Sequence, residues 1–241
     1  MAIDTVVLDI EGTVCPITFV KEKLFPYFLE KLPSFLSEIS NFTSLQADDK
    51  DPIKAILSQL PEQIRTSKDS VLEYFNDLVR RDIKDPILKQ LQGFIWKLGY
   101  ENGDLKAPVY EDSIEFIKTF PSKTENKRIY IYSSGSIKAQ ILLFGYVDEN
   151  GKSVDLNEYL SGYFDITTAG FKTQSSSYTK ILEDIGKEHG GSVLFLSDNV
   201  LEVEAALEAG MESYVVVRPG NAPLTDDDKS KYKIITSLEQ L

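Results

Sequence analysis

Four short polar segments of this sequence each follow an apolar run and carry side chains that could do chemistry. The first, Asp9-Ile10-Glu11-Gly12-Thr13, follows the run Ile3–Leu8. Side chains alternate near the end of a strand, so Asp9 and Glu11 can face the same way. A carboxylate nucleophile beside a second carboxyl group that acts as acid and base suits phosphoryl transfer through an aspartyl phosphate. The same pentad also fits a strand that ends in a polar turn.

Two further segments could bind an anion. The segment Ser133-Ser134-Gly135-Ser136 precedes a helical pattern, and hydroxyl groups with backbone N–H groups ahead of a helix can hold an anion. An ordinary helix cap is the alternative for these serines. Lys172, between a weak strand and a helix, could hold a phosphate and balance the charge of Asp9. The alternative for Lys172 is a surface lysine with no function.

The fourth segment places Asp198 after the apolar run Ser192–Leu196, with Glu202 four residues further on. Mg²⁺ prefers one or two carboxylates together with water and substrate phosphate, so Asp198 is a candidate metal ligand. Glu202 would lie in the first turn of the next helix, where it suits the helix dipole. It could equally orient Lys172 or a metal-bound water.

The elements around these segments indicate an α/β protein. Short continuous apolar runs are typical of strands buried on both faces of a parallel sheet. The predicted strands are Ile3–Leu8, Arg128–Tyr132, Ser192–Leu196, Ser213–Val217 and, more weakly, Tyr163–Thr167. Helical patterns separate the later strands, so we predict a doubly wound parallel sheet with right-handed crossovers. Ligands of such sheets bind outside the carboxyl ends of the strands, where all four segments would meet.

The stretch between the first two strands is helical in pattern. We therefore predict an α/β core at residues 1–13 and 126–241, with a helical cap subdomain inserted at residues 14–125. Phe94, Trp96 and Tyr100 lie in this insertion. They could pack in its core or cover an apolar part of a substrate.

Composition excludes several classes of function. The chain has 241 residues, of which 42% are hydrophobic and 27% charged, so it is not disordered as a whole. Its net charge of −12 opposes nucleic acid as a partner. One cysteine and one histidine exclude an internal disulfide and a multi-histidine metal site. Without a long apolar run or a secretion signal, we expect a protein that avoids membranes and works in the cytoplasm, with the nucleus as a further compartment. We also expect a monomer.

The order of the four segments resembles the haloacid dehalogenase superfamily of phosphohydrolases. Within it, the chain is similar to the enolase-phosphatase E1 family from Ile3 to a last strand near Ile235, the insertion included. Glu11, where most of the superfamily carries Asp, matches that family. The runs that carry this resemblance are LDIEGT, LQGFIWKLGY, IYIYSSGS, GFKTQSSSY, FLSDN and VVVRPGNAPLTDDDK.

This resemblance implies a Rossmann-like core and one Mg²⁺ per chain. Asp9 would be the nucleophile and a metal ligand, and Asp198 would complete the metal site. Glu11 would offer its backbone carbonyl to the metal and its carboxyl group to proton transfer. It is also the leading candidate for the base that starts enolisation, because its side chain is one methylene longer than that of Asp.

The resemblance also implies how a small phosphorylated substrate binds. Ser133, Ser134 and Lys172 would contact its phosphate. The family enolises 2,3-diketo-5-methylthiopentyl-1-phosphate and then removes the phosphate to give an acireductone in methionine salvage.

Two other functions remain open at this point. A generic sugar-phosphate phosphatase or phosphomutase of the same superfamily would need the same core residues. A phospho-acceptor receiver module also has a parallel sheet, acidic metal ligands, a hydroxyl residue and a lysine. The receiver carries two adjacent acids on its first strand and needs only about 120 residues, so the spacing and the insertion oppose it.

Overall fold

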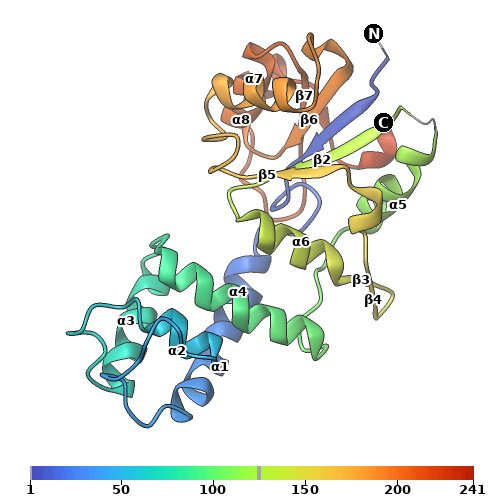
Figure 1. The fold of residues 1–241 in the computed structure, drawn as a ribbon. Helices are drawn as coiled ribbons and strands as arrows, with labels where there is room; N and C mark the ends of the chain where they lie inside the picture. The colour runs from blue at the N-terminus through green and yellow to red at the C-terminus, as the bar shows by residue number, and fades with distance from the viewer. Residues whose placement is uncertain (1, 124–125) are drawn as a thin grey trace. The chain divides into compact units, whose positions relative to one another are not determined.

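The computed structural model describes residues 2–123 and 126–241 (Figure 1). It divides into two compact units. The core unit comprises the chain up to Phe19 and from Lys106 onward, and the helical unit comprises Val20–Leu105.

Six parallel strands form the sheet of the core unit in the order β5-β2-β1-β6-β7-β8, counted over the described residues. Their bounds are Thr5–Leu8 (β1), Arg128–Tyr132 (β2), Gly162–Phe164 (β5), Val193–Ser197 (β6), Glu212–Val216 (β7) and Ile234–Ile235 (β8). Every residue of β1 and β6 is buried, as their apolar runs predict. The α/β fold with a doubly wound parallel sheet is confirmed.

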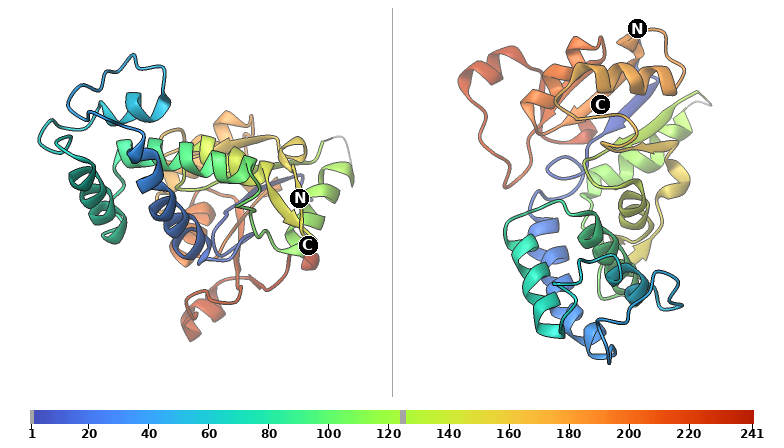
Figure 2. Two further views of the ribbon diagram at one scale, coloured as in Figure 1. Left: turned by 90° about the horizontal axis from the view of Figure 1, so that it is seen from below. Right: turned by 60° about the vertical axis from the view of Figure 1, so that its left-hand side comes forward.

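Helices cover both faces of this sheet. The bounds are Glu111–Thr119 (α5), Ile137–Gly145 (α6), Ser175–Asp184 (α7), Val200–Glu208 (α8) and Asp226–Lys231 (α9). Helices α7 and α8 lie on one side of the sheet and α5 on the other (Figures 1 and 2). The chain runs from β1 outward through β2 to β5 and then returns to β6 on the other side of β1. The topological switch point, where such sheets bind ligands, therefore lies between β1 and β6.

A small hairpin of the core unit was not predicted. Strands β3 (Val147–Glu149) and β4 (Lys152–Val154) pair antiparallel. Asn150 and Gly151 between them have φ angles of 54° and 80°, as a tight hairpin turn requires. Short 3-10 turns complete the unit at Pro121–Lys123 (η2), Asn157–Tyr159 (η3), Gly190–Ser192 (η4) and Leu238–Gln240 (η5).

The helical unit has its own apolar core. A π-helical turn, Val20–Leu24 (η1), leads into α1 (Phe25–Ser37), followed by α2 (Pro52–Leu57), α3 (Lys68–Arg80) and α4 (Pro86–Glu101). Asp51, Ser67 and Asp85 cap α2, α3 and α4 by accepting hydrogen bonds from backbone N–H groups of the first turn. The core contains large side chains with no exposed surface, among them Phe28, Leu32, Phe75 and Leu91.

Two of the three aromatic residues singled out in the insertion, Trp96 and Phe94, pack against this core. Trp96 stacks on Phe25 with ring centroids 6.4 Å apart. Its indole N–H donates to the Leu24 carbonyl at 2.8 Å. Tyr100 is buried as well. These contacts account for the helical spacing of the aromatic residues without a substrate, because a buried indole N–H needs such a partner.

The helical unit is shorter than the predicted insertion of residues 14–125. Val14 and Cys15 are buried in the core unit, where their N–H groups donate to the Ile10 carbonyl. Helix α5 belongs to the core unit too, since it packs against η5. Helical periodicity reveals a buried face but not the unit that buries it. The predicted limits at residues 1 and 125 lie outside the described residues.

None of the helices in the described part of the chain is long and apolar enough to cross a membrane.

Two glycines of α4 test the packing of the helical unit. A Cβ at Gly93 would meet nothing within 4 Å, whereas one at Gly99 would lie 2.7 Å from the Tyr27 ring. Gly93→Ala should stabilise the protein by about 0.5–1 kcal/mol through helix propensity. Gly99→Ala should be about 1–3 kcal/mol less favourable than Gly93→Ala because of overpacking. Urea unfolding measures both, and equal shifts would contradict the α1–α4 contact.

Candidate active site

All seven side chains proposed from the sequence line one cavity of about 400 Å³ in the core unit. They come from the segments that follow β1, β2, β5 and β6, which are neighbours in the sheet. The lining consists of Asp9, Glu11, Ile17, Ser133, Ser134, Lys172, Asp198, Asn199, Val200, Glu202, Ala222, Pro223, Leu224 and Asp228. The predicted convergence of distant segments at the carboxyl ends of the strands is therefore present.

Asp9 continues β1 beyond its last strand residue. Its N–H donates to the Leu196 carbonyl of β6 at 2.9 Å, and only 6% of the residue is exposed. Gly12 then turns the chain with a φ angle of +78°. A Cβ at Gly12 would collide with the carboxylate of Asp198. Glycine is therefore required here both by the backbone conformation and by the close approach of Asp198.

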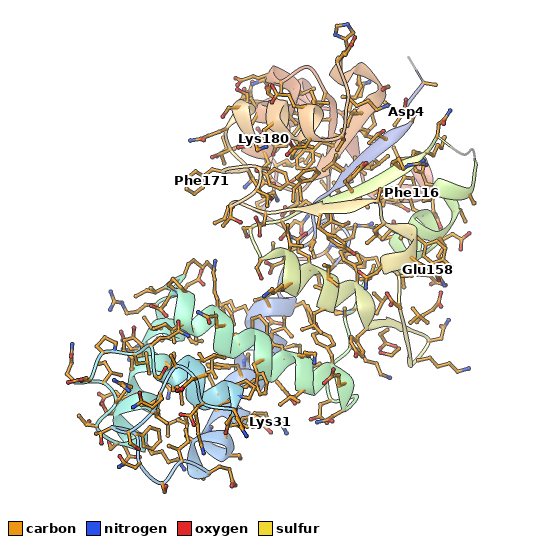
Figure 3. All side chains as sticks on the ribbon, viewed as in Figure 1. Asp4, Lys31, Phe116, Glu158, Phe171 and Lys180 are labelled. Atoms are coloured by element: carbon orange, nitrogen blue, oxygen red, sulfur yellow. The ribbon has the colours of Figure 1, made fainter. Side chains whose placement is uncertain are left out.

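Lys172 joins two of the acids. Its ammonium group donates to the carboxylate of Asp9 and lies 2.7 Å from Glu202 Oε2. The hydroxyl of Tyr178 donates to the Lys172 carbonyl at 2.7 Å and fixes the backbone of this segment. The preceding Phe171 points outward and is 63% exposed (Figure 3), whereas Lys172 is 9% exposed. The surface-lysine alternative for Lys172 is thus wrong.

The charges of the cavity are unbalanced. Burial lowers the pKa of Lys172, but the charges of Asp9 and Glu202 outweigh burial and raise it above its usual value. Burial raises the pKa of Asp198 to about 7, and repulsion from Asp9 and Glu202 adds to this. The pKa of Glu202 is raised by burial and then by the charge of Asp9. One lysine therefore faces three crowded carboxyl groups, and a further cation would relieve their repulsion.

The donor set fits Mg²⁺ better than a softer metal. Across residues 2–123 and 126–241, no group of three or more His, Cys, Asp or Glu side chains is arranged to hold a metal ion. Mg²⁺ does not need such a cage, because it is usually bound through one or two carboxylates and keeps several waters. Asp9 and Asp198 can supply two carboxylates.

The serine segment is braced by two residues that the sequence did not indicate. Gln140 donates from Nε2 to the carbonyls of Gly135 at 2.8 Å and Phe164 at 2.9 Å, which ties the segment to β5. Asp165, directly after β5, accepts from the N–H of Ile137 at 3.1 Å. Both contacts hold the start of α6, and with it the segment that carries Ser133, at the edge of the cavity.

Ser197 is a third residue of the site that the sequence did not indicate. This buried last residue of β6 donates from its hydroxyl to Glu202 at 2.8 Å and accepts from the N–H of Asn199 at 3.1 Å. It thereby orients Glu202 toward Lys172. A serine at a strand end is too common for its spacing to signal this role.

The comparison with known families agrees with this geometry. The model of the haloacid dehalogenase-like hydrolases matches residues 3–210. Enolase-phosphatase E1 of Scheffersomyces stipitis is 99% identical over 241 residues, with both chains covered completely. The chain belongs to the enolase-phosphatase E1 family of haloacid dehalogenase-like hydrolases. Enolase-phosphatase E1 of Candida tropicalis, another member, is 64% identical over 100% of this chain and 99% of its own.

Solved structures support the enolase-phosphatase E1 fold. The UTR4 protein of Saccharomyces cerevisiae is 48% identical, with a TM-score of 0.85 over 99% of this chain and 100% of its own. The haloacid dehalogenase-type hydrolase YfnB of Bacillus subtilis, solved with bound magnesium, has a TM-score of 0.56 at 14% identity over 100% of this chain and 97% of its own. At that identity the likeness shows the fold alone.

Asp165 provides a pH-dependent test of the contacts that hold the start of α6. Burial raises its pKa, but hydrogen bonds from Thr167, Ile137 and Thr168 outweigh burial and hold the pKa below its usual value. The carboxylate thus stabilises the fold above its unfolded pKa of about 3.9, and this is lost as the pH falls through the lower folded value. Asp165→Asn should cost about 1–3 kcal/mol at pH 7.

Urea unfolding at pH 7 and below pH 4 measures this effect. The difference between wild type and Asp165→Asn should shrink at the lower pH. The exposed Asp184, paired with Lys180 at 3.0 Å, provides the control. Asp184→Asn should change stability by at most about 0.5 kcal/mol. An unchanged gap at low pH would exclude the carboxylate as the source.

Proposed function

We propose that this protein is an enolase-phosphatase that converts 2,3-diketo-5-methylthiopentyl-1-phosphate, through its enol phosphate, to the acireductone and phosphate in methionine salvage. The observation that carries the proposal is the 99% identity to Enolase-phosphatase E1 of Scheffersomyces stipitis over the full length. The cavity lined by Asp9, Glu11, Lys172 and Asp198 supports it, because phosphoryl transfer depends chiefly on positioning and charge stabilisation.

We propose one Mg²⁺ per chain. Asp9 and Asp198 would hold it with their carboxylates, and Glu11 with its backbone carbonyl. The surplus of carboxyl groups around Lys172 supports this choice of residues. When bound, the ion supplies positive charge that offsets the repulsion between a substrate phosphate and the acids of the cavity.

In the phosphatase half-reaction, Asp9 attacks the phosphorus atom. A bond forms between a carboxylate oxygen and phosphorus, and the bond from phosphorus to the C1 oxygen of the substrate breaks. Lys172, Ser133 and Ser134 hold the phosphate while this happens, and Glu11 donates a proton to the departing oxygen. Glu11 then accepts a proton from the water that attacks the phosphoryl group and regenerates Asp9.

In the enolase half-reaction, a base removes a proton from C1, the C–H electron pair forms a double bond to the adjacent carbonyl carbon, and the negative charge moves to the carbonyl oxygen. A proton from water on that oxygen then gives the enol. We propose Glu11 as this base, since it lines the same cavity as the phosphate-binding residues. Lys172 stabilises the negative charge that develops on the dicarbonyl oxygen. The base must come within about 2.6–3.2 Å of the proton it removes, or act through one water.

We further propose that the enzyme acts as a monomer in the cytoplasm and the nucleus on this small phosphorylated metabolite, with neither nucleic acid nor a membrane as a partner. The net charge of −12 supports the exclusion of nucleic acid.

The decisive experiment follows two signals on the pure protein with Mg²⁺ and the diketo phosphate. Enol absorbance should rise first, and phosphate release should follow. Asp9→Asn should reduce phosphate release by about 10³-fold or more while circular dichroism stays unchanged. Chelation of Mg²⁺ should also stop turnover. Phosphate release from many simple esters without an enol signal would instead favour a generic sugar-phosphate phosphatase.

Glu11→Asp separates the two half-reactions. Shortening the side chain by one methylene moves the carboxyl group away from C1, so the reaction of the diketone should fall by about 10²-fold. Hydrolysis of the pre-formed enol phosphate should fall less. Rates for both substrates are measured under the same conditions, and equal losses would remove Glu11 as the enolisation base.

A further inference from the structure

The segment that follows Asp9 is a tight turn with an internal and an external set of hydrogen bonds. Inside the turn, the N–H groups of residues 13–15 all donate to the Ile10 carbonyl, at 3.2, 3.0 and 3.0 Å. The N–H of Gly12 donates to the Cys15 carbonyl at 2.7 Å. These bonds use the amides of the turn but only the carbonyls of Ile10 and Cys15, so the carbonyls of residues 12–14 must find donors elsewhere.

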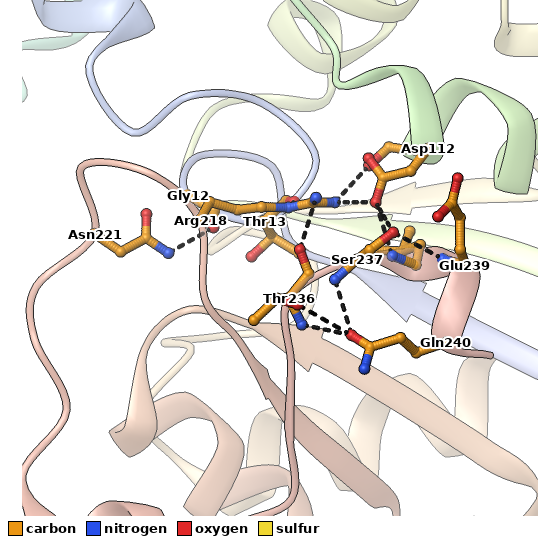
Figure 4. Close-up of polar contacts among 11 residues, drawn as sticks. Gly12, Thr13, Asp112, Arg218, Asn221, Thr236, Ser237, Glu239 and Gln240 are labelled. Carbon is orange, nitrogen blue, oxygen red and sulfur yellow. Dashed lines mark hydrogen bonds and ion pairs between the residues drawn. The ribbon is translucent and has the colours of Figure 1, made fainter.

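Three consecutive carbonyls of this turn accept from distant parts of the core unit. Asn221 Nδ2 donates to the carbonyl of residue 12, Arg218 Nε to that of residue 13, and the N–H of Tyr110 to that of residue 14, each at 2.9 Å. Figure 4 shows the first two contacts. The donors lie about 100 and 200 residues away in the sequence. Hydrogen bonds from other parts of the core unit thus hold three consecutive carbonyl groups of the turn after the proposed nucleophile.

Arg218 is itself fixed on every side. It is 8% exposed and its guanidinium group lies 4.5 Å from the centre of the Tyr110 ring. Its Nη2 atom donates to Asp112 at 2.8 Å, and Nη1 donates to the Thr236 carbonyl at 3.2 Å (Figure 4). Nη2 also donates to the Ser113 hydroxyl at 3.1 Å. A planar group with donors in a fixed fork can hold several acceptors at once, which lysine cannot.

The partner of Arg218 is equally constrained. The Asp112 carboxylate also accepts from the hydroxyl of Ser237 at 3.0 Å and from the N–H of Leu238 at 2.7 Å. Burial raises the pKa of Asp112, but the bond from Arg218 and that from Leu238 outweigh burial and lower it. The ion pair therefore joins α5, η5 and the loop after β7 into one rigid support.

The hydrogen bonds of Asn221 fix the orientation of its side-chain amide. Its Nδ2 atom faces two carbonyl oxygens, those of Gly12 at 2.9 Å and Val216 at 3.3 Å. Only the amide nitrogen can donate to both. Asn221 therefore fastens the turn to the end of β7.

We propose that Arg218 and Asn221 are positioning residues that hold the turn after β1, so that Asp9 is in line for attack on the substrate phosphorus and Glu11 reaches the departing oxygen. Neither side chain lines the cavity, so they act through the backbone of residues 12 and 13. The inference rests on the proposed function only in the roles of Asp9 and Glu11. Displacement of reacting groups by about 1 Å can cost about 10²-fold in rate, so such a support has catalytic consequences.

Arg218→Lys and Asn221→Ala test the proposal. Lys187→Met and Asn157→Ala are matched controls. Lys187 pairs with Asp4 at 2.6 Å at the other end of β1, and Asn157 Nδ2 donates to a backbone carbonyl far from the turn, at 3.1 Å. The assay is Mg²⁺-dependent hydrolysis of p-nitrophenyl phosphate. It is run about 15 °C or more below the Tm of every variant, so that each variant stays folded during the measurement.

For Arg218→Lys and Asn221→Ala, kcat should fall by about 10- to 100-fold while KM changes by less than about 3-fold. The controls should lower Tm but keep kcat within about 2-fold. A normal kcat in both test variants, with lowered Tm, would overturn the proposal and leave only a structural brace. If Arg218→Lys does not fold, Asn221→Ala decides alone.

This assay separates the proposal from the proposed function. A wild type that hydrolyses the aryl phosphate but not the diketo phosphate would refute the substrate and leave the positioning test intact. Aryl phosphate hydrolysis that survives Asp9→Asn would overturn the roles on which the positioning proposal rests.

Discussion

The central constraint in this molecule is a buried lysine surrounded by more acids than it can neutralise. Lys172 pairs with Asp9 and Glu202, and Asp198 stands nearby with its pKa raised to about 7 by burial and by the other carboxylates. Burying unbalanced charge costs free energy unless something compensates it. A divalent cation bound beside these acids would offset their surplus negative charge, and it would do so again when a substrate phosphate adds further negative charge.

The fold meets this constraint by gathering the charges at the one place where a parallel sheet leaves an opening. Asp9 and Asp198 follow β1 and β6, the two strands at the topological switch point. Because both strands are buried, their carboxyl ends are rigidly spaced. Gly12 lets the acids approach, since any Cβ there would collide with Asp198. The position of the turn after Asp9 is set by Arg218 and Asn221, which donate hydrogen bonds to its outer carbonyl groups.

Much of the site could be predicted from the sequence because short-range rules apply to it. Continuous apolar runs mark buried strands, and polar groups directly after them must lie at one edge of the sheet. The residues that hold the site's loops in place follow no such rule. Gln140, Asp165 and Arg218 act on backbone groups that only the tertiary fold brings near, and any carbonyl in the chain is a possible partner. The β3–β4 hairpin did carry a usable signal in Asn150-Gly151, a dipeptide typical of tight hairpin turns.

The proposed chemistry requires a covalent phosphoryl group on Asp9, and direct detection of that adduct is its sharpest test. Enzyme and substrate are mixed, quenched with acid during turnover, digested, and analysed by peptide mass spectrometry. We expect a phosphoryl group on the peptide that contains Asp9, with borohydride reduction converting that residue to homoserine. Steady phosphate release with an unmodified Asp9 peptide, or a phosphoryl group on Ser133 instead, would contradict it.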